Sequence, residues 1–280
     1  MFIKNDCKDM KKIFLLLLVG LLAVVSAYGR QQTEVEKDVE PFSVVNIIGG
    51  LNVVYEQGSS YQVRLVGSAD DIDAVSVKVV ANSLNLQSKS VRTNTLDNVY
   101  VDMYVEMTED ARAEKVTVYV TAPDVMSFTM AGSGTLSVEK ISSKWVAFNL
   151  AGSGQVDVKR LSASSASFNV TGSGCMDIGN LKAKAVNLTV SGSGSLKAYV
   201  ADAFSLSCST VGTGDIRVSG KADMYDKSTI GQSSINDSAL KYGKKKESTV
   251  NNSVIYNGTG GSGSVGSERP RVVDGIVVNP

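Results

Sequence analysis

The chain has 280 residues, of which 43% are hydrophobic, 28 are Lys or Arg, 28 are Asp or Glu, and none is His. A chain without His cannot hold a Ser-His-Asp triad, a His general base or a His-ligated zinc ion. A formal net charge of zero argues against a nucleic-acid-binding protein, which needs a basic face, so we expect no nucleic-acid partner.

Residues 1–29 are predicted to be a signal peptide. A charged start is followed by the apolar run IFLLLLVGLLAVV and by small residues that suit cleavage after Gly29. Either Met1 or Met10, which begins MKKIF, can be the initiator. The apolar run is shorter than the about 20 residues that cross a bilayer. We therefore expect an exported protein, periplasmic, on the outer-membrane surface or secreted, with no membrane span in its mature chain. A short linker is expected over residues 30–37.

Residues 38–122 alternate apolar and polar side chains in several short stretches, which is typical of strands. The stretch NIIGGLNVVYEQG reads as strand, glycine turn, strand, and ADDIDA (Ala69–Ala74) as one helical turn. We expect this half to be an irregular start to the same sheet system as the rest of the chain, and not a separate enzyme domain.

A short motif then recurs every 20 residues. Gly-Ser-Gly stands at 132–134, 152–154, 172–174 and 192–194, and Gly212-Thr213-Gly214 follows. Apolar residues alternate on both sides of each motif, which predicts strand, tight turn, strand. Glycine suits a turn where successive coils stack closely. A fixed period of this size indicates stacked repeats. The predicted fold is all-β: a β-solenoid, parallel β-helix-like, with coils of about 20 residues and Gly-Ser-Gly turns.

Aligned at the motif, the repeats form columns of equivalent residues. The column before each turn is apolar and is predicted to face the core: Phe128, Phe148, Phe168, Leu188 and Cys208. Cys175 falls in an outward column and on a different coil from Cys208. A disulfide needs Cα atoms within about 7 Å, so we expect two free thiols, with Cys175 exposed and Cys208 buried.

The repeat continues in weaker form after residue 226. STVGTGDI, from Ser209, is echoed by STIGQSSI, from Ser228, and then by STVNNS, from Ser248. We predict degenerate capping coils over 227–258, in which Lys227 and Glu247 continue the Phe column. KYGKKK, from Lys241, is expected to be a solvated loop. Residues 259–280 are Gly- and Ser-rich at their start and are expected to form a flexible tail.

The ordered N-terminal strands, the step KVTVYVTAPDVMSFTMAGSGTLSV and the five phased turns resemble the head GIN domain, a family described as auto-transporter adhesins. The resemblance covers about 38–226. It implies a β-helix-like fold, export, and an adhesive or surface role of a kind frequent in Bacteroidetes. It implies no catalytic residues and no cofactor.

A polar column lies between the apolar ones and is predicted to face outward. Its members, with one from the column beside it, are our candidates for ligand binding: Asn149, Asn169, Asn187 and Thr189. Amide and hydroxyl groups in register can bind an extended glycan, or a protein, at the cell surface. The same column can also simply solvate the sheet, with its members bonded along the stack.

Asp157 and Asp177 stack in a second outward column and give the sharpest enzymatic alternative. Some β-solenoids are polysaccharide lyases or hydrolases, and two adjacent carboxylates can bind a cation or share a proton. The simpler reading is that both are exposed to water and that Asp177 pairs with Lys197 on the next coil. The sequence thus favours a non-enzymatic binding module. The alternatives are a carbohydrate-active enzyme and a purely structural envelope protein.

Overall fold

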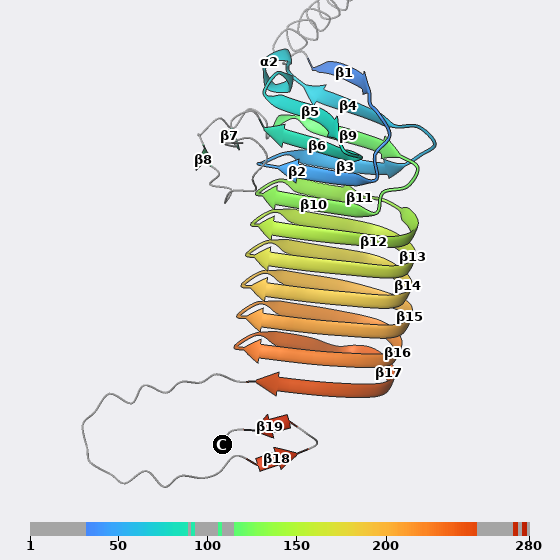
Figure 1. Cartoon of the computed structure of the whole chain (residues 1–280), viewed down its shortest axis with the longest axis vertical. Coiled ribbons are helices and arrows are strands. Elements are labelled where there is room, and N and C mark those ends of the chain that lie inside the picture. The colour runs from blue at the N-terminus through green and yellow to red at the C-terminus, as the bar shows by residue number, and fades with distance from the viewer. Residues whose placement is uncertain are drawn as a thin grey trace, which may run out of the picture.

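The structure, a computed structural model, describes residues 32–88, 91–92, 106–107, 115–250, 271–273 and 276–278. The predicted signal peptide lies outside the described residues. Most of the described chain forms one sheet that is wound into a β-solenoid, with coils stacked along one axis (Figure 1). The predicted fold class is confirmed.

The repeats form coils that pair in parallel and in register. The coils from the second repeat onward are β12 (Ile141–Gly152), β13 (Gln155–Gly172), β14 (Cys175–Gly192), β15 (Ser195–Gly212), β16 (Asp215–Gly231) and β17 (Ser234–Val250). From β13 onward each coil is a single strand of 17 or 18 residues. A strand lies on each side of every glycine turn, as predicted, but it runs without a break from one turn to the next. The backbone bonds run along the stack to the next coil, so the chain bends without losing its partners.

The N-terminal half extends the same stack, as predicted. β10 (Ser127–Gly132) and β11 (Thr135–Val138) lie in parallel on β2 (Val44–Ile48) and β3 (Asn52–Gln57). Toward the N-terminal end of the stack, β6 (Ser83–Ser88) pairs with β2 and β9 (Thr117–Ala122) pairs with β3, again in parallel. The chain order is therefore broken, because β2 and β3 enter the stack between later segments. The expected helical turn is present as α2 (Ala69–Ile72).

Antiparallel strands close the N-terminal end. β5 (Val75–Val80) pairs with β6, while β4 (Gln62–Gly67) pairs with β9 and carries β1 (Thr33–Asp38) on its outer edge. Most of the predicted linker is thus a strand. The sequence TEVEKD has only one strongly apolar residue in six positions, so its alternation did not predict a strand. Another antiparallel pair joins β7 (Val91–Arg92) to β8 (Glu106–Met107).

The glycine turns hold successive coils close together. Gly152 has φ +118°, and a Cβ atom there would lie 2.6 Å from the carbonyl oxygen of Gly132 on the preceding coil. The same oxygen accepts hydrogen bonds from the amides of Ser153 at 3.1 Å and Gly154 at 2.9 Å. Only glycine combines this conformation with this approach, so the turn prediction is confirmed.

The core runs the length of the stack. Phe148 lies between Phe128 and Phe168, with ring centroids 4.8 and 5.5 Å apart and ring planes 7° from parallel in both pairs. Cys208 is buried in this column and Cys175 is exposed, and both thiols are free, as predicted. Other inward columns line the rest of the coil. Two of them are Ile141, Leu161, Leu181 and Val200, and Val146, Ala166, Val186, Leu206 and Tyr225.

The stack continues to Val250. Lys227 pairs in register with Cys208 and with Glu247, so the Phe column continues as expected. Residues 251–258 of the predicted capping coils lie outside the described residues. The predicted loop from Lys241 is instead part of β17, because the strand follows the pairing of the coil above despite its charges. Within the predicted tail, β18 (Arg271–Val273) and β19 (Ile276–Val278) form an antiparallel pair.

Candidate functional site

The predicted polar column runs along one outward face of the solenoid. Asn149 pairs in register with Asn169, and Asn169 with Thr189, while Asn187 lies beside them, paired with Ser167. The structure therefore brings the four candidate residues together on adjacent coils. The column is also longer than expected, because it continues through the N-terminal strands. Its members in stack order are Asn85, Asn46, Thr129, Asn149, Asn169, Thr189, Ser209, Ser228 and Ser248.

All members of this polar column are partly exposed. Two of its neighbouring pairs bond side chain to side chain: Asn169 Nδ2 donates to Asn149 Oδ1 at 2.9 Å, and Asn46 Nδ2 donates to Asn85 Oδ1 at 3.0 Å. These bonds hold the amides in a common orientation along the stack and still leave lone pairs and N–H groups for a ligand. With coils about 4.8 Å apart, nine members span about 38 Å.

Small residues flank the polar column on both sides. Ser127, Ala147, Ser167, Asn187 and Ser207 lie on one side, and Ala131, Ala151, Thr171 and Ser191 on the other. We call the polar column with these flanking residues the polar face. From β10 to β14 these short side chains leave the face nearly flat, which suits contact with an extended partner. Toward the C-terminal end the second flanking column continues as the exposed residues Val211, Ile230 and Val250.

The two aspartates of the enzymatic alternative lie on a different outward face. Asp157 and Asp177 pair in register on adjacent coils, and Asp177 Oδ2 forms an ion pair with Lys197 Nζ at 3.0 Å. Both residues are partly exposed, and 45% of the Asp177 side chain is open to solvent, so the carboxylates face water as the sequence suggested. Among the described residues, no group of three or more Cys, Asp or Glu side chains is arranged to hold a metal ion.

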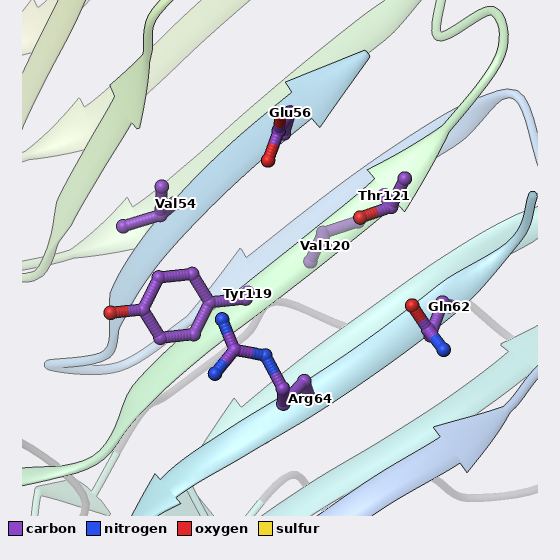
Figure 2. Close-up of a pocket in the computed structure, with 7 residues that line it drawn as sticks. All are labelled: Val54, Glu56, Gln62, Arg64, Tyr119, Val120 and Thr121. Carbon is purple, nitrogen blue, oxygen red and sulfur yellow. The ribbon is translucent and has the colours of Figure 1, made fainter. Parts of the chain in front are cut away.

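A small pocket of about 50 Å³ lies on the outer surface of the N-terminal strands (Figure 2). The Arg64 guanidinium stacks on the Tyr119 ring, 4.1 Å from its centroid, and pairs with Glu34 at 3.1 Å. Glu56 and Gln62 lie on the same surface, from β3 and β4. A volume of this size holds little more than a water molecule or two, and the Arg64 cation is already neutralised, so this pocket is a poor candidate for a ligand site.

A charged cluster closes the core at its C-terminal end. Asp237 on β17 forms ion pairs with Lys227, at 3.5 Å, and with Lys245, at 3.1 Å; both lysines also pair with Glu247. Burial alone would raise the pKa of Asp237, but its hydrogen bond with Lys245 and the charge of Lys227 lower that pKa overall. The hydrogen bond with Lys245 lowers the pKa of Glu247. Inward charges of this kind oppose the addition of another apolar coil.

Sequence reasoning missed this cluster, apart from Lys227 and Glu247, and the outer part of the polar column. Asp237 and Lys245 lie on a coil whose sequence matches the repeat only weakly, so their columns could not be assigned from the sequence. Asn46 and Asn85 enter the stack out of chain order, so no fixed period connects them to Asn149. A usable signal for Asn46 was the strand–glycine–strand form of its segment, which matches the repeated coils.

Stacked, in-register coils with long outward columns define a β-solenoid repeat protein, a class that displays extended surfaces. A family model described as "Putative auto-transporter adhesin, head GIN domain" matches residues 41–223 and, in a second match, residues 177–251. The chain belongs to this family, which confirms the resemblance seen in the sequence. No curated protein matches the chain.

Solved structures with the same fold include proteins of Bacteroides and Parabacteroides species. A putative adhesin from Bacteroides fragilis is 17% identical, with TM-score 0.61, and the match covers 80% of this chain and 95% of that one. A putative adhesin from Parabacteroides distasonis is 16% identical, with TM-score 0.61, and the match covers 80% of this chain and 95% of that one. A putative lipid binding protein from the same species is 18% identical, with TM-score 0.55, and the match covers 80% of this chain and 93% of that one. At these identities the likeness concerns the fold alone.

Proposed function

We propose that this protein is an exported, non-enzymatic binding module that holds an extended glycan or a protein segment on its polar face. The observation that carries the proposal is the polar column, in register over nine coils and partly exposed throughout. A column with one polar group per coil matches a ligand that is itself extended and repetitive.

Membership of a family described as adhesins supports export and a role at the cell surface. Among the described residues, no helix has the length and apolar character to cross a bilayer. Treating whole cells of the native host with an external protease tests the location. Digestion in intact cells supports surface display, whereas protection until the outer membrane is opened would place the protein in the periplasm and undercut adhesion.

The binding face is tested by placing a bulky side chain on it. Ala151 is exposed beside the polar column, so Ala151→Arg should obstruct a ligand without disturbing the core. Gln155→Arg, exposed on the face that carries Asp157, is the matched control. The labelled protein is applied to arrays of extended glycans and of extracellular matrix proteins. We expect a signal that Ala151→Arg abolishes and Gln155→Arg keeps. Equal signals for both variants would remove the polar face from the proposal.

The alternative function, a carbohydrate-active enzyme, depends on Asp157 and Asp177. The Asp177 carboxylate is paired with Lys197. Among the described residues, no third acidic side chain joins Asp157 and Asp177 to form a metal site. Incubation with neutral and acidic polysaccharides, followed by assays for new reducing ends and for unsaturated products, tests it. Product that disappears in Asp157→Asn would replace our proposal with an enzyme.

A further inference from the structure

A third outward face of the solenoid is strongly basic although the whole chain has no net charge. It is formed by the outward side chains of residues 139–145, 159–165, 179–185, 199–205, 219–224 and 239–244, which we call the basic face. Its acidic members are Glu139, Asp202 and Asp223. Its basic members are Lys140, Lys144, Lys159, Arg160, Lys182, Lys184, Lys221, Lys241 and Lys244.

The excess charge on this face is available to a ligand. Glu139 already pairs with Lys159 and Arg160, and Asp202 with Lys221 at 3.8 Å. The remaining lysines of the face make no ion pair with any described residue and are exposed to solvent: Lys140, Lys144, Lys182, Lys184, Lys241 and Lys244. A surface that concentrates unpaired positive charge attracts a polyanion and loses that attraction as salt is added.

Large apolar side chains stand out of the same face. Trp145 is 55% exposed, Phe204 59% and Met224 41%. Single exposed apolar side chains are common on protein surfaces, but large ones that lie beside several unpaired cations add contact area for a ligand. Tyr242, 44% exposed, is another large side chain of this face. Tyr199, 50% exposed, lies on the opposite border of the face.

The register places these residues in a line along the stack. Lys144 and Lys184 occupy one column two coils apart, about 10 Å. Phe204 follows Lys184 on the next coil of the same column. Trp145, Met224 and Lys244 belong to the column beside it. From β12 to β17 this line is about 24 Å long and carries three lysines and three large apolar side chains. Asp223, one coil after Phe204 in the first column, is the single carboxylate of these two columns, so the line keeps a net positive charge.

We propose that the basic face binds a linear acidic polysaccharide that lies along the stack. Its carboxylate or sulfate groups would pair with Lys144, Lys184 and Lys244, and its sugar rings would lie against Trp145 and Phe204. Spaced lysines and exposed apolar side chains along one line favour this class of ligand, because such a polymer repeats charged groups and apolar ring faces along one direction. A membrane surface fits less well, since Trp145 is about 14 Å from Phe204 and about 19 Å from Met224, with Lys184 between them. The proposal concerns a different face and does not rest on the function assigned to the polar face.

The experiment measures binding of fluorescently labelled full-length mature protein to polygalacturonate. Dextran is the neutral control, and anionic phospholipid vesicles and a single-stranded oligonucleotide represent other polyanions. The charge variant is Lys144→Gln with Lys184→Gln. Its matched control is Lys37→Gln with Lys78→Gln, which removes the same charge from exposed positions at the N-terminal end. A third variant, Trp145→Ala with Phe204→Ala, removes the rings alone. Melting temperatures verify that all variants fold.

We expect polygalacturonate to bind and dextran not to bind. The Lys144/Lys184 variant should bind about tenfold more weakly and with a smaller dependence on salt, because two charge contacts of modest strength are lost. The Trp145/Phe204 variant should also bind more weakly but keep the salt dependence of the native protein. The Lys37/Lys78 control should bind as the native protein does.

Equal affinity of the Lys144/Lys184 variant and its Lys37/Lys78 control would overturn the proposal, as would equal binding of dextran. Tighter binding of vesicles or of the oligonucleotide than of polygalacturonate would also overturn it and assign the face to that other ligand. Ala151→Arg separates the two faces: it should leave polygalacturonate binding unchanged while removing the ligand of the polar face.

Discussion

The carbonyl oxygen of Gly132 lies 2.6 Å from the point where a Cβ atom on Gly152 would stand. Any side chain at position 152 must push the two coils apart, and it must also adopt a φ of +118°, which is unfavourable for every residue except glycine. The same relationship recurs between Gly152 and Gly172 and between Gly172 and Gly192. The turns therefore set how closely the coils stack.

We expect Gly152→Ala to lower the free energy of unfolding by roughly 1–3 kcal/mol, because strain of this kind costs about that much. Chemical denaturation measures the loss. Ser153→Ala, one residue along and exposed, is the control and should be nearly neutral. If both variants have the denaturation midpoint of the native protein, the close approach of the coils at this turn is wrong.

Phe148→Asp should unfold the solenoid. The side chain is fully buried between Phe128 and Phe168, so the change removes an aromatic worth about 3–5 kcal/mol and places an unpaired charge in the core. Asn149→Asp, the next residue, faces outward and should be tolerated. Circular dichroism melting curves compare the two, and equal melting temperatures would contradict the inward and outward assignment.

Cys175 should react with a thiol reagent in the folded protein, and Cys208 only after denaturation. Cys175 is exposed, whereas Cys208 is buried, and burial raises the pKa of its thiol to about 12. Since the thiolate is the reactive form, both access and ionisation protect Cys208. Mass spectrometry of tryptic peptides after timed labelling reads out each site. Rapid labelling of Cys208 without denaturant would show that the C-terminal coils open readily.

Acid should destabilise the C-terminal coils through Asp237 and Glu247. Their pKa values are lower in the folded protein than the ordinary values of 3.8 and 4.5. The ion pairs therefore stabilise the fold above those ordinary values, and this contribution is lost as pH falls through the lowered ones. Melting temperature measured from neutral pH to about pH 3 should fall more steeply for the native protein than for Asp237→Asn with Glu247→Gln. Parallel curves would mean that the cluster adds nothing to stability.

A chain that ends at Val250 should fold and melt as the full-length mature protein does, because β17 is the last strand of the main sheet among the described residues. A chain that ends at Gly220 loses the rest of β16 and all of β17. It exposes the residues that these strands cover and should melt at a lower temperature. If the Gly220 truncation melts like the native protein, residues 227–250 are not part of the cooperative fold.

The sequence by itself determined the repeat architecture. The 20-residue spacing of the glycine turns and the alternation around Phe148 and Asn149 leave one arrangement that buries a face, which is in-register stacking. Which side chains face inward follows from the same alternation, because successive residues of a strand point to opposite sides. The burial of Cys208 and the grouping of Asn149, Asn169 and Thr189 could be predicted on that basis.

Only the tertiary structure decided which distant segments join each face. Asn46 and Asn85 extend the polar column because β2 and β6 enter the stack out of chain order, and no periodicity records that. Asp237 meets Lys227 and Lys245 across the core of the last coils, a contact between opposite walls that strand register does not define. The bends within each coil decide that lysines such as Lys144 and Lys184 lie on one face with Trp145 and Phe204. Alternation tells inward from outward, but it does not tell one outward face from another, since that depends on where each strand bends.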